Sequence, residues 1–247
     1  MKKLLSIKLI LILILIFSVL INCIAFYYIY NSFTKLQYSR IFPLGFNPSA
    51  QAVSRKEIKR NDTLLMIGDS RVAMWPKQYI SKEIYNIAHG GQTSSQVLLQ
   101  LQGEKLSNKG VAFLQVCIND IHSIKAIPDL KKQVMAQCKN NIVRITELLT
   151  VQGYKVILST LYPPDTPPLS RKLFWPEDFK NIFDEINTFI KSQENNNVFV
   201  LDAFSLLKQT ENYYLKEEYI DDDFFLHINE SAYKKLSIEL YKMLLKL

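Results

Sequence analysis

The chain has 247 residues, of which 48% are hydrophobic and 21% charged, so it can bury one sizeable core, and general disorder is excluded. Its formal net charge is +7, but Lys2, Lys3 and Lys8 supply three of these charges and the other +4 is spread along the chain. That distribution excludes the clustered basic surface of a nucleic-acid-binding protein, so no nucleic-acid partner is predicted.

Residues 1–30 are predicted to anchor the chain in a membrane. An apolar run at 9–21 continues to residue 30 without an acidic side chain. The run alone has the length of a signal-peptide core, but with its aromatic extension it reaches the roughly 20 residues that span a bilayer. We favour an uncleaved anchor because no A-x-A cleavage site is present, and because Asn22 disfavours a lipoprotein site at Cys23. The N-terminal lysines predict a cytoplasmic N-terminus, with the rest of the chain outside.

Residues 31–61 are predicted to form a polar stalk and lead-in, because Pro43, Gly45 and Pro48 interrupt any long helix. From residue 62 to 247, short apolar runs alternate with amphipathic segments. We predict strands at 63–68, 83–88, 111–118, 155–161 and 198–203, and helices at 93–107, 129–151, 177–194 and from 229. This alternation predicts a single α/β domain, a three-layer α/β/α sandwich around a mostly parallel five-stranded sheet. Ligands of such sheets bind at the carboxyl ends of the strands.

The proline-rich stretch 161–179 directly follows the fourth predicted strand. Two interpretations stay open, a surface crossover and the rim of a pocket, because long ordered loops are often functional. In the second interpretation Tyr162, Phe174 and Trp175 would contact a ligand.

Ser70 follows the first predicted strand, in the stretch IGDSRV. Gly, Asp and Ser are common in turns, so the tripeptide GDS alone is weak evidence for function. A nucleophilic serine needs a base, a group that orients this base, and donors for an oxyanion. Candidate partners occur in NIAHGGQTS at 86–94, VCIND at 116–120 and DDDFFLHIN at 221–229. Each of these stretches closes a predicted strand or precedes a helix, so all can meet at one edge of the sheet.

These four stretches, in this order, resemble the SGNH, or GDSL-like, hydrolase family over about residues 62–246. The resemblance implies that Ser70 is the nucleophile and His227 the general base. It also implies that the N–H groups of Ser70 and Gly91 and the side-chain amide of Asn119 bind the oxyanion. No G-x-S-x-G motif occurs, which disfavours the ordinary α/β-hydrolase variant. No metal or cofactor is expected, and we interpret the other two histidines, His89 and His122, as structural.

The sequence departs from the family pattern at two positions. The family places an aspartate three residues before the histidine, where this chain has Phe224. We predict that Asp223 orients His227 through a one-residue bulge, with Asp222 and a backbone carbonyl as alternatives. The second departure is Cys117, which stands where the third stretch usually begins with glycine. A disulfide between Cys117 and Cys138 is compatible with a location outside the cytoplasm, but nothing in the sequence requires it.

Three side chains are predicted to bind substrate: Arg71, Tyr162 and Trp175. Arg71 would recognise an anionic group, with a surface salt bridge as the alternative, whereas Asp69 is assigned to holding the turn.

The function predicted from these residues is that of a membrane-anchored serine esterase outside the cytoplasm, acting on acyl or acetyl esters of an envelope glycan or lipid. One alternative is an O-acyltransferase that uses the same residues to pass the acyl group to a sugar hydroxyl. Another is an inactive module that only binds a partner, for which Phe224 and Cys117 are the evidence.

Overall fold

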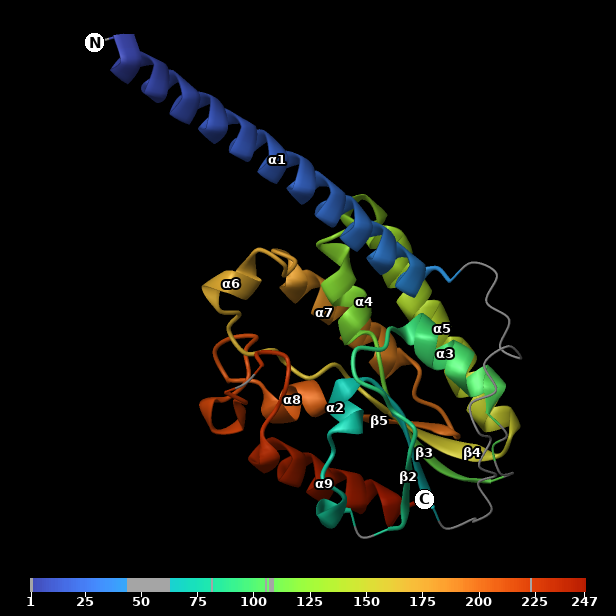
Figure 1. Ribbon diagram of the computed structural model, residues 1–247. Helices are drawn as coiled ribbons and strands as arrows, with labels where there is room; N and C mark the ends of the chain where they lie inside the picture. Colours follow the sequence, from blue (N-terminus) through green and yellow to red (C-terminus); the bar gives the residue numbers. More distant parts are fainter. Residues whose placement is uncertain (1, 44–62, 81, 105, 107–108, 223) are drawn as a thin grey trace.

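The computed structural model describes residues 2–43, 63–80, 82–104, 106, 109–222 and 224–247. A long N-terminal helix leads into an α/β domain, from which its first half projects (Figure 1). The helices and strands that follow alternate along the chain, as the sequence predicts.

Five parallel strands form the sheet, in the order β2-β1-β3-β4-β5. Their bounds are β1 Leu64–Gly68, β2 Ile84–Asn86, β3 Gly110–Gln115, β4 Tyr154–Ser159 and β5 Val198–Leu201. The central strands are apolar on both faces, because helices cover the sheet on both sides. In β1, for example, Leu65 and Ile67 belong to one core, and Leu64 and Met66 to the other.

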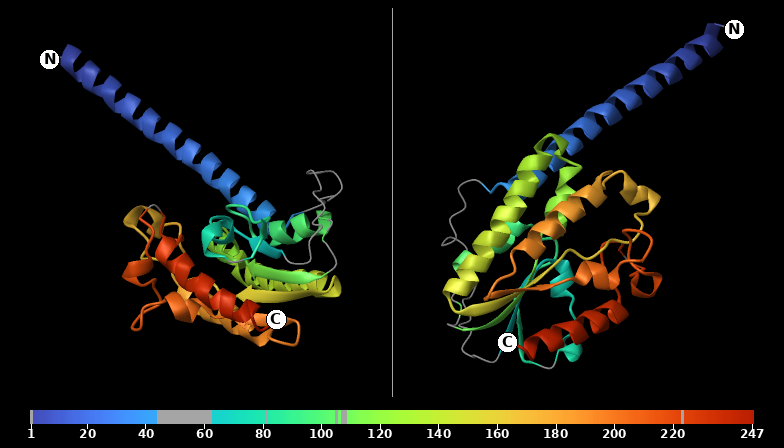
Figure 2. Two further views of the ribbon diagram at one scale, coloured as in Figure 1. Left: turned by 90° about the horizontal axis from the view of Figure 1, so that it is seen from below. Right: turned by 180° about the vertical axis from the view of Figure 1, so that it is seen from behind.

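Helices form the two outer layers of the sandwich (Figure 2). One layer contains α3 Ser94–Gly103, α4 Ile118–Ile124, α5 Lys131–Val151 and α7 Phe179–Ser192. The opposite layer contains α2 Ser70–Ala73, α8 Ala203–Leu207 and α9 Glu230–Leu244. The short helix α6, Leu169–Lys172, lies in the connection between β4 and α7. Short 3-10 turns occupy Lys77–Tyr79, Pro128–Leu130 and Glu217–Tyr219. The three-layer α/β/α prediction is confirmed.

The N-terminal helix α1, Lys2–Ile41, is long and apolar enough to cross a membrane, with a candidate span at Ile7–Ile41. Its most apolar window is not buried against the rest of the chain. The helix does not end near residue 30, where we predicted a stalk to begin, because no helix-breaking residue occurs before Pro43. Its last turns pack on α3 and α4, and Gln37 and Ile41 are buried there. The predicted stalk therefore begins as a docked helix, and its part from 44 to 61 lies outside the described residues.

Candidate active site

The candidate site lies where the order of the strands reverses. The chain passes from β1 to β2 on one side and then returns to β3 on the other side of β1. In open parallel sheets this switch point leaves a crevice at the carboxyl ends of the two strands. Ser70 directly follows β1, and Asn119 lies at the start of α4, shortly after β3. Two of the predicted site residues therefore flank the switch point.

The side chains of Ser70 and His227 meet at this crevice, with His227 Nε2 3.2 Å from Ser70 Oγ. The turn that presents Ser70 is tight, because a Cβ at Gly68 would lie 2.2 Å from the carbonyl oxygen of Gln115. Asp69 caps α2 by accepting a hydrogen bond from the Arg71 N–H, in agreement with its predicted role in the turn. A hydroxyl within hydrogen-bonding reach of an imidazole is the geometry that a nucleophile and its base require.

The loop after β2, which contains Gly91, lies beside Ser70 and is bonded to Asn119. A Cβ at Gly90 would lie 3.9 Å from the Cβ of Ser70, so this loop borders the serine. Gly91 has a φ of 75°, a left-handed conformation that favours glycine. The Asn119 amide donates a hydrogen bond of 2.9 Å to the carbonyl of Gln92, which joins the start of α4 to this loop. An amide carries two N–H donors, and this hydrogen bond uses one of them.

The group that orients His227 stays a prediction. Asp223 lies outside the described residues, whereas Asp222 is exposed. Asp221 accepts a hydrogen bond from the N–H of Phe224, and the Phe224 ring packs on His227, with 4.8 Å between the ring centroids.

Comparisons with known proteins agree with this geometry. The family model described as GDSL-like lipase/acylhydrolase matches residues 62–240. The chain belongs to the GDSL-like lipase/acylhydrolase family. No match was found among functionally curated proteins.

Solved structures of several lipases and esterases share the fold of this family member. A GDSL-like lipase from Bacteroides thetaiotaomicron is 17% identical, with a TM-score of 0.62 over 81% of this chain and 94% of the other. A protein from Bacteroides fragilis assigned as an acylhydrolase is 19% identical, with a TM-score of 0.60 over 83% and 96% of the two chains. An acetyl xylan esterase is 17% identical, with a TM-score of 0.51 over 73% and 98%.

In this GDSL-like hydrolase Arg71 is fully buried, so the structure does not support the prediction that it contacts substrate. Its Nε donates to the carbonyl of Leu226 at 2.7 Å, and its Nη1 donates to that of Tyr162 at 2.8 Å. Because Leu226 immediately precedes His227, Arg71 ties the histidine segment to the helix that begins with Ser70. The alternative of a surface salt bridge is also excluded by this burial.

Tyr162 and Trp175 are also buried, at 0% and 3% exposure, which corrects their assignment as substrate contacts. The backbone of Tyr162 accepts the hydrogen bond from Arg71, and its ring lies beside the guanidinium. Trp175 packs edge-on against Phe225, with 5.3 Å between the ring centroids. These aromatic side chains therefore pack inside the domain, against Arg71 and Phe225.

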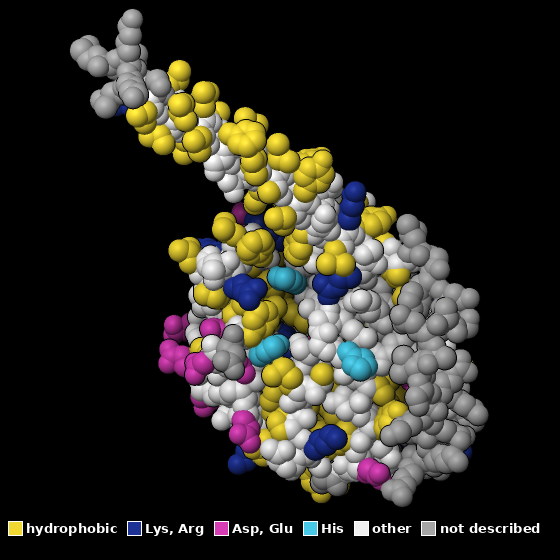
Figure 3. All heavy atoms as spheres, viewed as in Figure 1, with side chains coloured by type: hydrophobic (Ala, Val, Ile, Leu, Met, Phe, Trp, Pro, Cys, Tyr) yellow, Lys and Arg dark blue, Asp and Glu magenta, His cyan; other side chains and the backbone are white. Residues whose placement is uncertain are grey.

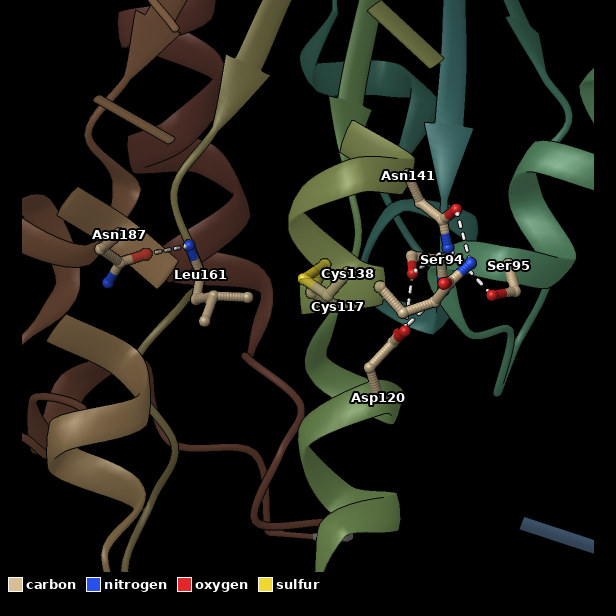
Figure 4. The surroundings of a disulfide bond; sticks show 9 residues. Ser94, Ser95, Cys117, Asp120, Cys138, Asn141, Leu161 and Asn187 are labelled. Atoms are coloured by element: carbon tan, nitrogen blue, oxygen red, sulfur yellow. Dashed lines mark hydrogen bonds between the residues drawn. A yellow bond between two sulfur atoms is a disulfide. The ribbon is translucent and has the colours of Figure 1, made fainter. Parts of the chain in front are cut away.

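Cys117 is bonded to Cys138 in a disulfide, near the hydrogen bonds that join α3, α4 and α5 (Figure 4). Cys117 has a φ of 88° and directly precedes α4. A glycine would adopt this left-handed conformation without steric cost, which explains physically why the family has glycine here. The disulfide holds this turn, two residues before Asn119, against α5.

A buried hydrogen-bond network that the sequence did not predict lies next to this turn. Asp120 accepts hydrogen bonds from the N–H and hydroxyl of Ser94, at 2.8 and 2.6 Å. Asn141 donates to the hydroxyls of Ser94 and Ser95. Burial raises the pKa of Asp120, and the Ser94 hydrogen bonds oppose that shift. The only available signal was an acidic residue beside Asn119, which does not identify its partner.

The docked end of α1 was also missed. The Arg40 guanidinium donates to the carbonyl of Gly91, and the Arg40 carbonyl accepts from the Thr93 hydroxyl. Gln37 accepts a hydrogen bond of 2.8 Å from Ser123 in α4. The N-terminal helix therefore contacts two of the three segments that carry the predicted oxyanion donors, those of Gly91 and Asn119.

His89 and His122 do not join a cluster of metal ligands, since the described ranges hold no group of three or more His, Cys, Asp or Glu placed to bind an ion. His122 lies beside Trp175, 6.3 Å between ring centroids. Burial lowers its pKa, and the positive charges of Arg40 and Arg171 add to that effect.

Removing the disulfide should destabilise the domain. For a separation of 21 residues, the Cys117→Ala/Cys138→Ala variant is expected to lose about 3 kcal/mol of unfolding free energy. The Cys117→Gly/Cys138→Ala variant should recover about 1 kcal/mol of this, because alanine is strained at the φ of residue 117. Thermal unfolding in detergent measures both variants. Equal stability of the two would contradict the role of the left-handed turn.

Asp69 should make stability pH-dependent. Burial raises its pKa from 3.8 to about 6, and the nearby Arg71 charge opposes the shift. A raised carboxyl pKa means that the folded state binds the proton more tightly, so stability falls as pH rises from about 4 to 6, by about 3 kcal/mol in total. Asp69→Asn keeps the capping oxygen and removes this dependence. Its melting temperature should therefore rise relative to wild type over that pH range, and parallel curves would contradict the assignment.

Proposed function

We propose that this chain is a membrane-anchored serine esterase that hydrolyses acyl or acetyl esters outside the cytoplasm. The observation that carries the proposal is the 3.2 Å separation between His227 Nε2 and Ser70 Oγ. Membership of the GDSL-like lipase/acylhydrolase family supports it.

In the proposed reaction Ser70 Oγ bonds to the acyl carbon while its proton moves to His227 Nε2. The negative charge on the carbonyl oxygen is met by the N–H groups of Ser70 and Gly91 and by an N–H of the Asn119 amide. The alcohol then leaves with the proton from His227. Water next attacks the acyl-enzyme, His227 accepts the proton of the water, and the carboxylic acid is released as Ser70 regains its hydrogen.

The location outside the cytoplasm has two supports. The basic residues before the apolar part of α1 favour a cytoplasmic N-terminus. The Cys117–Cys138 disulfide fits an oxidising compartment, because disulfides are rare in the cytosol. An envelope glycan or lipid is then the substrate within reach. One similar structure is an acetyl xylan esterase, which makes an acetyl ester the first substrate to test.

The direct test is to treat the full-length protein in detergent with a fluorophosphonate and to locate the adduct by mass spectrometry. We expect phosphonylation of Ser70, together with release of acetate from p-nitrophenyl acetate. Acetyl groups appearing on an added glycan, without free acetate, would instead support the O-acyltransferase. The absence of both labelling and turnover would support the module that only binds a partner.

Asp223 is proposed to orient His227. Asp223→Ala should lower kcat at least about a hundredfold, because an unsupported imidazole adopts the wrong tautomer. Asp222→Ala is the matched control and should stay close to wild type. If Asp222→Ala causes the larger loss, the two aspartates exchange roles, and if neither matters, a backbone carbonyl orients the histidine.

A further inference from the structure

The helix α6 and the residues after it carry an unusual group of exposed apolar side chains. Leu169, Leu173 and Phe174 are 84%, 73% and 51% exposed. Leu169 and Leu173 are four residues apart on a helical turn, so they lie on one face. Isolated surface leucines need no explanation, but neighbouring large apolar groups on one loop indicate a surface that is covered in use.

The position of α6 indicates what covers this group. In Figure 1 and in the right-hand view of Figure 2, α6 lies at the end of the domain from which α1 leaves. Hydrophobic side chains continue from the projecting part of α1 onto this end of the domain (Figure 3). A bilayer crossed by α1 would therefore face α6.

The charges of this segment fit a membrane surface. Arg171 and Lys172 are exposed between the apolar residues, and basic side chains beside apolar ones are typical of interfacial segments. The acidic residues that follow are neutralised locally, since Glu177 pairs with Lys125, and Asp178 with Lys131.

The same segment borders the candidate site. The Arg171 guanidinium lies over the ring of Phe224, 5.3 Å from its centroid. Phe224 in turn packs on His227. On the buried side of the segment, Trp175 contacts His122 and Phe225. The exposed end of this loop and the site are thus connected by direct contacts.

We propose that residues 169–174 dock on the bilayer that α1 crosses and place the mouth of the site at the membrane surface, where it takes esters of membrane lipids. The apolar side chains enter the interface, and Arg171 and Lys172 meet anionic headgroups. The choice of a lipid ester rests on the proposed function, whereas the docking does not.

The docking test uses full-length protein in vesicles of phosphatidylcholine, alone or mixed with phosphatidylglycerol. In a Cys23→Ser background, Leu173→Cys carries an environment-sensitive dye, and lipids with a spin label on the acyl chain act as quenchers. We expect a blue-shifted emission and strong quenching, greater with phosphatidylglycerol. Val151→Cys is the matched control, because Val151 is 87% exposed and is the last residue of α5, a helix that ends on the side of the domain away from α6 (Figure 1). A Leu173 label that behaves like the Val151 label would overturn the docking.

The substrate test compares an acetylated diacylglycerol in the vesicle with p-nitrophenyl acetate in the buffer. The Leu169→Ser/Leu173→Ser variant should lower the ratio of the two rates at least about tenfold, the effect expected when even one of the two leucines no longer buries its side chain. Val151→Ser should leave the ratio unchanged. Quenching with an unchanged ratio would overturn the lipid ester as substrate. If neither ester is hydrolysed by wild type while the Leu173 label is quenched, the proposed function fails and the docking stands.

Discussion

Replacing Ser70 by alanine is expected to lower kcat for ester hydrolysis at least about 10³-fold, because no other group supplies the nucleophilic oxygen. His227→Ala should cause a loss of similar size, since the hydroxyl then has no base 3.2 Å away. In the double variant the losses should not add, because the two side chains act as one unit. Initial rates with p-nitrophenyl acetate measure all three variants.

The control for these variants is Ser192→Ala, because Ser192 is an exposed serine near the end of α7. It should retain the wild-type rate. Unchanged melting temperatures would show that the Ser70 and His227 variants are folded. A Ser70→Ala variant as active as wild type would rule out the acyl-enzyme.

Replacing Arg71 by methionine should cost about 2–6 kcal/mol of stability, because it removes a buried group that makes two hydrogen bonds, together with the nearby positive charge that favours ionised Asp69. The carbonyls of Leu226 and Tyr162 also lose their donors. The segment that carries His227 is then held less firmly, so kcat should fall as well. Thermal unfolding and ester hydrolysis of the same sample measure the two effects.

Two further arginine variants test whether the hydrogen bonds and the charge of Arg71 are the cause of these losses. Arg71→Lys keeps the charge but lacks the planar fork that reaches two carbonyls, so its stability should lie between wild type and Arg71→Met. Arg144→Met removes an exposed arginine from α5 and should change stability by less than about 0.5 kcal/mol. A stable and fully active Arg71→Met variant would remove the positioning role.

The sequence predicted elements whose signal is local. The apolar runs became strands with ends within a few residues of those expected, and helix α9 begins at Glu230 after the capping residue Asn229. The third strand ends at Gln115 rather than at 118. Its end is set by the left-handed turn at Cys117, and the apolar character of the following residues does not reveal a backbone φ.

Features that depend on contacts distant in sequence could not be predicted in this way. Nothing in the stretch around Arg71 shows that its side chain points into the domain toward a carbonyl 155 positions away. The partner of Arg40 is likewise a carbonyl 51 positions away. Arg40 lies in the predicted stalk, which was not expected to contact the domain. By contrast, the meeting of Ser70 and His227 followed from the family resemblance, which carries information about such distant pairs.

Because α1 continues without a break into its docked end, the helix also fixes how the domain is rotated about the axis of α1. One residue inserted between Tyr30 and Gln37 would turn the whole domain by about 100° around the axis of α1, and advance it by about 1.5 Å. Four inserted residues would nearly restore the original facing, whereas two would reverse it. The number of residues in this short segment therefore determines which face of the domain points in a given direction around α1.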